Sequence, residues 1–388
     1  MSKIKYNNCA LVITANATGL AVIRSLNKVG VDTVIFSRPD DLCLFSNIPV
    51  EKNIYNIDSW KEGLLASLNQ YENLDLVLIP TADIHLEFIY ENYEYLNNKF
   101  ILSVTNTETL YKLTDKSKES ELIESMGVLA PKTLFSVNNK DIETLALPII
   151  FKAKSHSNNP LIKKNIVVNT EDELTSFVNE FENTYGSIIA QEVIPGGEED
   201  LWITSCTFNK GKLVSFFCYQ RRSASPKLYG VTSFAESKYN ETLEILSRSI
   251  GENLEYHGNA DIEFKWDYRD GTFKYIELNA RIGMLGWFDT VCGVNNIANS
   301  YYIFSNNQRL IKSERQKDGL LLLSLYEDFY SRRKAGEHIV SIFSLYIKSI
   351  QALKASLFFT IKDPTPGIVA YYRYTSAMVA SITRKIRS

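Results

Sequence analysis

The sequence predicts an α/β protein with more than one domain, and three observations lead to this prediction. The chain has 388 residues, which is more than one ordinary hydrophobic core accommodates. Its first segment reads as strand, loop, helix and strand, a βαβ unit that indicates a parallel sheet. Residues 261–283 form two runs of alternating polar and apolar residues around a glycine turn, which indicates an antiparallel hairpin.

The opening βαβ unit is "CALVITANATGLAVIRSLNKVGVDTVIFSRPD", in which Gly30 ends the helix before a β-branched run. Further strands at residues 74–80 and 100–104 would complete a small parallel sheet through about residue 112. The loop "TANATG" has one glycine where the dinucleotide-binding fingerprint needs three. The sequence therefore argues against an NAD site.

The length of the hairpin loop decides which side chains share a face. A two-residue loop would set Glu263 across from Leu278 and mix acidic with apolar side chains. A three-residue loop, with glycine in the left-handed conformation, would pair Tyr268 with Thr272 and set Glu263 across from Glu277. The second register keeps the apolar residues together, so it is the one we predict.

In this register Asp261 lies across from Asn279, beside the facing pair of Glu263 and Glu277. Like charges directly across a strand pair are destabilising by a few tenths to about 1 kcal/mol, so something must offset the repulsion. Solvent with the nearby Lys265 is one answer, and a divalent cation is the other. Carboxylate and amide oxygens suit Mg²⁺, which usually keeps waters and shares phosphate oxygens with a nucleotide.

This hairpin resembles the metal site of the ATP-grasp ligases, a Glu on one strand and a Glu-x-Asn with a following Arg on the next. The matching residues are Glu263, Glu277, Asn279 and Arg281. The resemblance implies that the first three hold one or two Mg²⁺ ions, or Mn²⁺, beside ATP. It also implies that Arg281 is catalytic and stabilises charge on the transferred phosphate.

ATP-grasp proteins also carry two phosphate-binding lysines, one just inside a helix and one on a strand. Residues 114–127 read as such a helix, and "LPIIFKAKS" reads as such a strand. The matching positions are Lys116 and Lys152, and the resemblance makes Lys152 catalytic as well. The loop after this strand, "SHSNNPLIKKN", lacks the glycines that are common there in the family, which predicts a lid that either differs in shape or becomes ordered only on binding.

The segment "SIIAQEVIPGGEEDLWITSCTF" resembles the hinge between the two ATP-grasp subdomains. In the family, backbone groups of the hinge read the adenine edge, which here corresponds to Glu192 and Ile194. A carboxylate later in the family's sequences accepts hydrogen bonds from the ribose hydroxyls. Glu199 is the candidate for that role, with Glu198 and Asp200 as its alternatives.

Adjacent Arg221 and Arg222 resemble a basic segment of predicted carboxylate-amine ligases in the same superfamily. Because the planar guanidinium can hold a carboxylate or phosphate by two hydrogen bonds, we predict that they bind substrate. The alternative is a basic edge on a surface strand.

The resemblance runs from about residue 8 to residue 305 and implies the domain organisation. The expected fold is an N-terminal parallel-sheet pre-ATP-grasp domain, a two-subdomain α+β ATP-grasp fold, and a basic, mainly helical C-terminal extension. The expected boundaries are 1–112, 113–305 with subdomains 113–190 and 191–305, and 306–388.

The formal net charge of -3 hides a basic C-terminal segment. Residues 345–388 hold seven Lys or Arg against one Asp, so the rest of the chain is acidic. Within the extension, "VSIFSLYIKSIQALKASLFF" is apolar and punctuated by lysines. We predict either a helix that packs on the body or an amphipathic helix at an anionic membrane surface.

Several other classes of protein find no support. The five cysteines and four histidines have no metal-ligand spacing, and no HExxH, GxSxG or P-loop motif occurs. No apolar run approaches 18 residues, and the basic tail lacks the features of a nucleic-acid-binding fold. We expect a cytoplasmic protein, with peripheral membrane contact as a further hypothesis.

The resemblance implies a reaction that joins a carboxylate to an amine through an acylphosphate. The carboxylate could be a small molecule, or a nucleotide- or lipid-linked sugar acid that receives an amino acid in a surface polysaccharide or cell-wall precursor. The alternatives are an amino-acid ligase of metabolism, a kinase or carboxylase of the same fold, and a non-catalytic nucleotide-binding scaffold.

Overall fold

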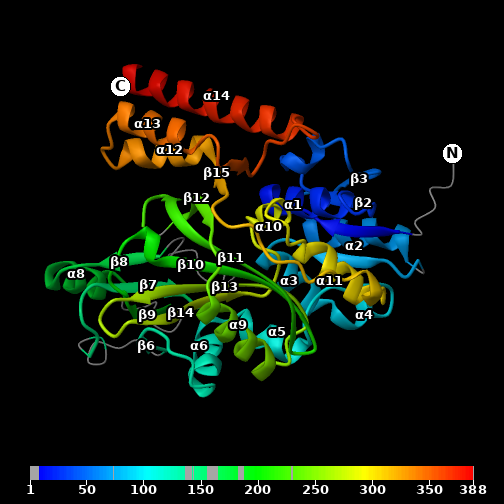
Figure 1. The fold of residues 1–388 in the computed structure, drawn as a ribbon, viewed down its shortest axis with the longest axis horizontal. Helices are drawn as coiled ribbons and strands as arrows, with labels where there is room; N and C mark the ends of the chain where they lie inside the picture. The colour runs from blue at the N-terminus through cyan, green and yellow to red at the C-terminus, as the bar shows by residue number, and fades with distance from the viewer. Residues whose placement is uncertain are drawn as a thin grey trace.

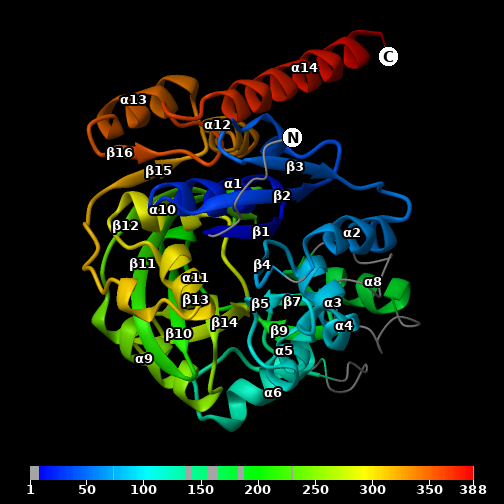
Figure 2. The same cartoon turned by 90° about the vertical axis from the view of Figure 1, so that its right-hand side faces the viewer.

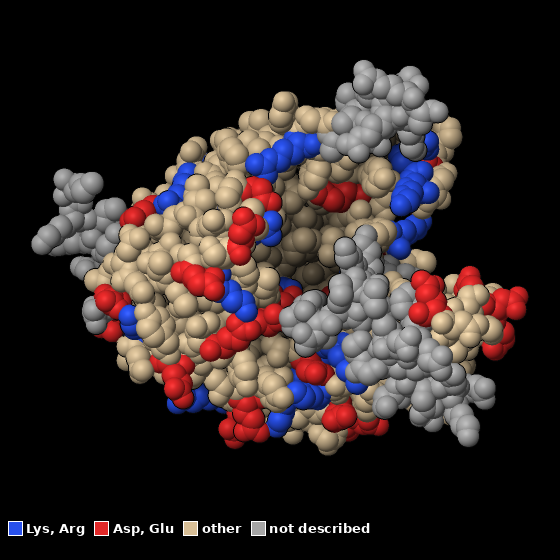
Figure 3. Space-filling view, turned by 180° about the vertical axis from the view of Figure 1, so that it is seen from behind, with Lys and Arg blue, Asp and Glu red and all other residues tan. Residues whose placement is uncertain are grey.

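The computed structural model describes residues 8–72, 74–135, 142, 144–154, 165–181, 188–228 and 230–387, with side chains as far as residue 376. Three sheets divide these residues along the chain (Figure 1). The C-terminal helices lie together at one end of the molecule in Figures 1 and 2. Seen from behind, the molecule has a hollow with both acidic and basic side chains around it (Figure 3).

The first sheet is parallel and has the strand order β3-β2-β1-β4-β5, which confirms the predicted parallel sheet. Its strands are β1 (Cys9–Ile13), β2 (Asp32–Ser37), β3 (Glu51–Ile54), β4 (Val77–Pro80) and β5 (Ile101–Leu102). Its helices are α1 (Asn16–Asn27), α2 (Trp60–Leu68), α3 (Asp83–Glu91), α4 (Tyr93–Asn97) and α5 (Thr107–Leu113), with the short turns η1 (Leu42–Phe45) and η2 (Asn69–Tyr71). All of β1 is buried because helices cover both faces of the sheet.

The second sheet has four antiparallel strands in the order β6-β9-β7-β8. They are β6 (Thr133–Leu134), β7 (Ile149–Ala153), β8 (Ile166–Val168) and β9 (Ile188–Glu192), and the helices α6 (Lys116–Ser125) and α8 (Glu171–Phe181) belong to the same part of the chain. Phe151 of β7 stacks on Phe177 of α8 with ring centroids 3.9 Å apart, which joins the sheet to its helix. Residues 155–164, most of the glycine-poor loop, lie outside the described residues.

The third sheet has seven strands in the order β14-β13-β10-β11-β12-β15-β16. They are β10 (Leu201–Asn209), β11 (Lys212–Ser225), β12 (Val231–Ser237), β13 (Gly258–Asp267), β14 (Thr272–Asn279), β15 (Leu321–Leu323) and β16 (Leu353–Ala355). Helices α9 (Glu241–Asn253), α10 (Gly286–Val291) and α11 (Asn296–Phe304) follow, with the turns η4 (Glu198–Asp200) and η5 (Gln308–Leu310). Ile297 and Tyr301 of α11 are buried in one core with Leu20 of α1, so the large sheet's helices rest on the N-terminal domain.

The C-terminal extension contains α12 (Leu325–Lys334), α13 (Ile339–Ser349) and α14 (Thr365–Arg387). It also contributes β15 and β16 to the large sheet, so it is not helical throughout. The expectation of one helix across residues 340–359 is wrong, because α13 ends at Ser349 and the chain then forms β16. Among the described residues no helix is both long and apolar enough to cross a membrane.

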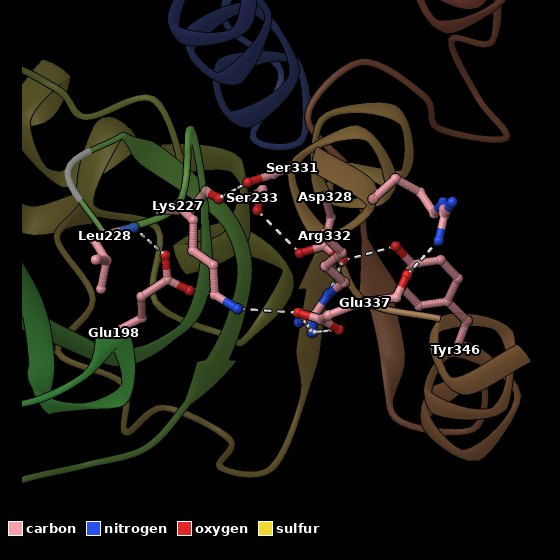
Figure 4. A network of polar contacts seen from close by, with 11 residues as sticks. Glu198, Lys227, Leu228, Ser233, Asp328, Ser331, Arg332, Glu337 and Tyr346 are labelled. Carbon is pink, nitrogen blue, oxygen red and sulfur yellow. Dashed lines mark hydrogen bonds and ion pairs between the residues drawn. The ribbon is translucent and has the colours of Figure 1, made fainter. Parts of the chain in front are cut away.

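A buried carboxylate fastens α12 and α13 to the large sheet (Figure 4). Asp328 is fully buried and accepts hydrogen bonds from Ser233 Oγ at 3.1 Å, Arg332 Nε at 2.6 Å and Tyr346 OH at 2.7 Å. Ser331 donates to a backbone carbonyl of β11 at 2.7 Å. Because a buried charge needs such partners, this network fixes the position of the extension.

Candidate active site

The hairpin of β13 and β14 brings the acidic residues together as predicted. Glu263 lies opposite Glu277, and Asp261 lies opposite Asn279. β13 pairs with β10 on its other side, whereas β14 is the edge strand of the sheet. The predicted facing of the two glutamates is therefore confirmed at the level of strand register.

The route to this register differs from the prediction. Asp267, and not Tyr268, pairs with Thr272, so the loop has one residue more than expected, and Gly271 adopts the predicted left-handed conformation at φ +68°. A bulge in β14 then inserts Ile276 and restores the facing of the glutamates.

The bulge also redistributes the apolar residues. Leu278 packs in a core with Ile262 and Phe264, whereas Ile276 packs in a separate core that includes Ile203 and Phe217. The prediction that this register keeps the apolar residues of the hairpin together is therefore wrong for Ile276, which does not share a face with Leu278. An inserted residue moves each side chain that precedes it on the strand to the opposite face of the sheet from the one that simple alternation predicts.

Lys116 reaches this hairpin from the start of α6. Asp115 caps the helix by accepting from the backbone N–H of Ser117, and the N–H of Lys116 donates to the carbonyl of Lys154 on the β7 side at 2.9 Å. The Lys116 ammonium lies 2.8 Å from a carboxylate oxygen of Glu277. The structure thus brings together two residues that sequence reasoning had assigned to phosphate and to metal.

The electrostatics of this pair favour two charged groups. Burial opposes the charge of Lys116, but Glu277 and Glu119 outweigh it and raise the pKa of Lys116. Burial likewise opposes the charge of Glu277, and Lys116 and Lys152 outweigh it and lower the pKa of Glu277 to about 2. Glu277 is therefore an ionised carboxylate in a positive environment.

Lys152 lies on β7 and is buried, with 8% of its surface exposed. Its ammonium donates to Gln191 Oε1 on β9 at 2.8 Å. Burial and the positive charge of Lys116 lower the pKa of Lys152, while Glu277 pulls in the opposite direction. The two predicted phosphate-binding lysines and Glu277 therefore belong to one electrostatic cluster.

Glu263 faces this cluster from β13. Burial and the charge of Glu277 raise its pKa, and Arg221 acts against them. Arg221 is buried on β11, where its Nε donates to Thr232 Oγ1 at 3.0 Å. Of the two predicted substrate arginines, Arg221 is thus the one whose charge acts on the acidic face.

Arg222 lies in a bulge of β11, and its side chain has different partners from that of Arg221. It forms ion pairs with Glu236 and with Glu199, the latter at 3.2 Å. Adjacent strand residues point to opposite faces, which explains why neighbouring arginines separate. Its role in substrate binding stays a prediction.

Arg281 is held by a residue that the sequence analysis missed. Its Nε and Nη2 donate to the two carboxylate oxygens of Asp83 at 2.8 and 2.7 Å, and Nη2 also lies 3.3 Å from Asn279 Oδ1. Asp83 begins α3 directly after β4. Its place at the carboxyl end of a parallel strand was the signal that could have identified it.

Two further residues of the cluster were missed. Glu119 is buried one turn after Lys116 and accepts from the backbone N–H of Leu278 at 2.7 Å and from the hydroxyl of Tyr275. Gln191 holds Lys152 from the neighbouring strand. The spacing of Lys116 and Glu119 on one helix was visible in the sequence, but the partner strand of Lys152 was not.

The predicted hinge residues lie between the second and third sheets. Glu192 accepts from the backbone N–H of Lys132 at 3.1 Å and from Arg269 Nη1 at 3.3 Å, and Ile194 is buried. Glu199 is largely exposed beside Arg222. The assignment of Glu192 and Ile194 to adenine and of Glu199 to ribose stays a prediction.

The two alternatives to Glu199 are engaged elsewhere. Glu198 accepts from the backbone N–H of Leu228 at 2.6 Å, and Asp200 accepts from that of Gly197 at 2.7 Å and from the hydroxyl of Tyr268. Both therefore stabilise turns in this structure.

The oxygen donors of the hairpin determine which metal ion could bind there. Among the described residues no group of three or more His, Cys, Asp or Glu side chains is arranged to hold a metal. The candidate set is instead Glu263, Glu277 and Asn279, two facing carboxylates and an amide. Such oxygen donors fit Mg²⁺, which completes its shell with waters and phosphate oxygens. The assignment of these three as ligands stays a prediction.

Solved structures show which fold this is. N5-carboxyaminoimidazole synthetase from Staphylococcus aureus matches with a TM-score of 0.64 and 16% identity, over 86% of each chain. The biotin carboxylase domain of 2-oxoglutarate carboxylase from Hydrogenobacter thermophilus, in complex with MgADP, ADP and bicarbonate, matches with a TM-score of 0.61 and 14% identity, over 82% of this chain and 73% of that one. The chain has the ATP-grasp fold.

One curated protein gives a more particular likeness. D-aspartate ligase of Enterococcus faecium (strain Aus0004) is 25% identical over 237 residues, which are 56% of this chain and 56% of that protein. The chain thus matches only about half the length of this relative. No protein-family model matches the chain.

Proposed function

We propose that the protein is an ATP-dependent ligase that joins a carboxylate to an amine. The observation that carries the proposal is the cluster of Lys116, Lys152, Glu277 and Glu263 in an ATP-grasp fold. The carboxylate would attack the γ-phosphate of ATP and release ADP. The amine would then displace phosphate from the acylphosphate and leave an amide.

Each residue of the cluster has a physical task in this reaction. Lys116 and Lys152 would hold phosphate oxygens and oppose the negative charge that develops during transfer. Glu263, Glu277 and Asn279 would hold Mg²⁺, which when bound neutralises β- and γ-phosphate charge. On nucleotide binding, Lys116 would exchange part of its contact with Glu277 for phosphate. No side chain has to act as a covalent nucleophile.

Arg281 and Arg221 would complete the positive side of the site. Asp83 holds the guanidinium of Arg281 in one orientation by two hydrogen bonds. The arginine side chain would therefore lose less conformational entropy on binding an anion. Arg221 is buried near Glu263, and we assign it to the carboxylate substrate. Arg222, paired with acidic side chains, is the weaker candidate.

The likeness to D-aspartate ligase supports an amino acid as one of the two substrates. We propose that the other is a small or a nucleotide- or lipid-linked carboxylate, and that the product belongs to a cell-wall or surface polysaccharide precursor. The five buried, unpaired cysteines support a reducing cytoplasm as the location.

We propose further that the protein contacts the inner membrane surface through α13. Ile339, Val340, Phe343, Ile347 and Ile350 are all exposed and fall on one side of this helix. In residues 325–376 no acidic side chain is exposed, whereas six lysines and arginines are. An apolar stripe within a basic surface fits an anionic lipid interface.

Liposome flotation tests this contact. The intact protein should float with anionic vesicles at low salt, and Ile347→Asp should abolish flotation. Ile245→Asp is the matched control, because Ile245 is similarly exposed on α9, away from the extension. Absence of salt-sensitive flotation would contradict the contact.

The ligase reaction is tested by Mg²⁺-dependent ADP release from ATP, with pooled amino acids and pooled sugar acids. Release that requires both pools is the expected result. ATP binding without release in any combination would favour the nucleotide-binding scaffold, and release without an amine would favour a kinase or carboxylase.

A further inference from the structure

A pocket of about 420 Å³ lies on the large sheet, at the end where the hairpin of β13 and β14 turns. The turn η4, the beginning of β10, the tip of the hairpin and the amino end of α9 surround it. We call it the aromatic pocket, because Trp202, Trp266, Tyr268 and Phe273 line it. Its volume is within the range of about 300–1,000 Å³ that small ligands occupy.

The aromatic pocket lies on the face of the sheet opposite to the candidate active site. Trp202 of β10 pairs with Phe264 of β13, whereas its neighbour Ile203 pairs with Glu263. Because adjacent residues of a strand point to opposite faces, Trp202 and Glu263 lie on different sides of the sheet. The pocket is therefore separate from the acidic face assigned to the ligase reaction, although Glu199, the candidate for ribose, lies at its rim.

Aromatic rings form the floor of the pocket. Phe273 packs edge to face against Trp202 and Trp266, with ring centroids 6.1 and 4.9 Å apart. Trp266 is half-buried, and Tyr268 is 67% exposed at the rim. A ligand that covers this floor needs a flat apolar face.

The acidic groups at the rim already have partners. Glu199 Oε1 lies 3.2 Å from Arg222 Nη1. Asp200 accepts hydrogen bonds from a backbone N–H at 2.7 Å and from the hydroxyl of Tyr268. The ammonium of Lys238 lies over a tryptophan ring of the floor, 5.2 Å from its centre, in a cation–π contact. A cationic ligand would therefore meet a positive charge beside carboxylates that are already engaged.

An anionic ligand is disfavoured as well. The amino end of α9 forms one wall, but Asn240 caps it by accepting from the backbone N–H of Leu243 at 3.2 Å. Two glutamates in the first turn of α9 compensate the positive end of the helix further. The carboxylates of η4 would repel an anion directly. The pocket therefore suits a ligand without net charge.

The remaining polar groups of the pocket are neutral. Within the described residues, the amide nitrogen of Asn240 and the hydroxyl of Thr242 make no hydrogen bond. Gln220 donates one N–H to the carbonyl of Glu199 at 2.6 Å, which leaves its second N–H. Hydroxyl groups of a ligand can both donate to and accept from such groups. A saccharide has flat C–H faces and a rim of hydroxyl groups, so it matches both the floor and the neutral rim.

We infer that the aromatic pocket binds a saccharide, outside the candidate active site. A pyranose ring packs on Trp266 and Tyr268, and its hydroxyl groups contact Asn240, Thr242 and Gln220. The inference does not depend on the ligase reaction, because the pocket lies on the other face of the sheet and binding there needs neither ATP nor Mg²⁺.

Saturation-transfer NMR titration of the full chain, without ATP, tests the pocket. The probes are cellobiose and N,N′-diacetylchitobiose, whose pyranose rings have flat C–H faces, and D-sorbitol, which has hydroxyl groups but no ring. At least one disaccharide should bind, and D-sorbitol should not. Trp266→Leu keeps an apolar side chain but removes the ring, and it should weaken the affinity about two- to tenfold. Tyr268→Ser should weaken it by about twofold or more.

Matched controls lie away from the pocket. Trp60→Leu removes a half-buried tryptophan of α2, and Tyr372→Ser removes a tyrosine of α14 that is 71% exposed. Both should bind the disaccharide as the unaltered protein does. Circular dichroism of all four variants establishes that they are folded. Because Tyr268 is exposed, its replacement tests the pocket even if Trp266→Leu does not fold.

Disaccharide binding that is weakened by a pocket variant and unchanged in both controls supports the inference. Failure of both disaccharides to bind, or affinity unchanged by both pocket variants, would overturn it. D-sorbitol binding as tightly as the disaccharides would also overturn it, because the aromatic floor would then contribute nothing. Indole is the last probe, and tighter binding of indole than of either disaccharide would show a purely apolar site instead. None of these outcomes depends on ADP release, so the pocket and the ligase proposal can fail separately.

Discussion

The replacement Glu277→Gln separates chemistry from stability. Glu277 is 28% exposed in its side chain, and one of its oxygens lies 2.8 Å from the Lys116 ammonium. Glutamine keeps the shape and one acceptor oxygen but removes the negative charge. Lys116 retains Glu119 nearby, so the free energy of unfolding should fall by no more than about 1.5–3 kcal/mol, the range for a hydrogen bond to a charged group.

The loss in turnover should be much larger. The pKa of Glu277 is lowered to about 2, so this carboxylate carries full charge at neutral pH and can act as an anionic ligand in the proposed metal set. Without its charge, the proposed Mg²⁺ site would lose a carboxylate ligand, and the phosphate-binding lysines would lose the carboxylate that attracts them. Removing one such stabilising group typically costs about 10²–10³-fold in rate, and we expect ADP release to fall at least this far.

Glu244→Gln is the matched control. Glu244 lies on α9, is 27% exposed in its side chain, and also has a 2.8 Å ion pair, with Arg248. It should lose a similar or smaller part of the stability and keep normal turnover. The assay is Mg²⁺-dependent ADP release, beside urea unfolding of both variants. Near-normal release from folded Glu277→Gln would refute the assignment of the site.

The remaining predictions concern stability. His85 has its pKa lowered by burial to about 3, below that of the unfolded chain, so stability should fall as pH drops from about 6.5 towards 3, by at most about 1.4 kcal/mol per unit. Urea midpoints against pH should flatten in His85→Gln; an unchanged slope would contradict this. Gly251→Ala would put a methyl group 2.1 Å from the Phe208 ring and should destabilise by about 1–3 kcal/mol, whereas Gly63→Ala, with ordinary contacts, should stabilise by up to about 1 kcal/mol. Thermal melts that rank the two glycine variants in the opposite order would show the packing argument to be wrong.

The sequence by itself determined the parallel sheet and the facing glutamates. Both depend on short-range patterns: β-branched runs between helices, and the period-2 alternation that keeps Glu263 and Glu277 on one face. The loop is one residue longer than predicted, and the bulge at Ile276 compensates for it, so the two glutamates still face each other while Ile276 leaves the predicted apolar face. The facing of the glutamates survived, although the bulge interrupts the alternation in β14, because burial of the apolar face constrains the register more strongly than the turn does.

Only the tertiary structure decided which charges meet. Lys116 pairs with Glu277 across 161 positions of sequence, and Arg281 pairs with Asp83 from another domain. Neither partner can be read from spacing, because an ion pair depends on distance in space and on the water that packing excludes. The same holds for adjacent Arg221 and Arg222, which point to opposite faces of β11 and there meet different partners.

The docking of the extension is likewise a tertiary feature. The apolar C-terminal segment predicted a helix. Whether the apolar side of α13 is covered depends on where the contacts of Asp328 place α12 and α13. Local sequence fixes what each segment can form, since propensity and alternation act over a few residues. The site arises where segments from three sheets converge, and that convergence is set by the packing of whole domains.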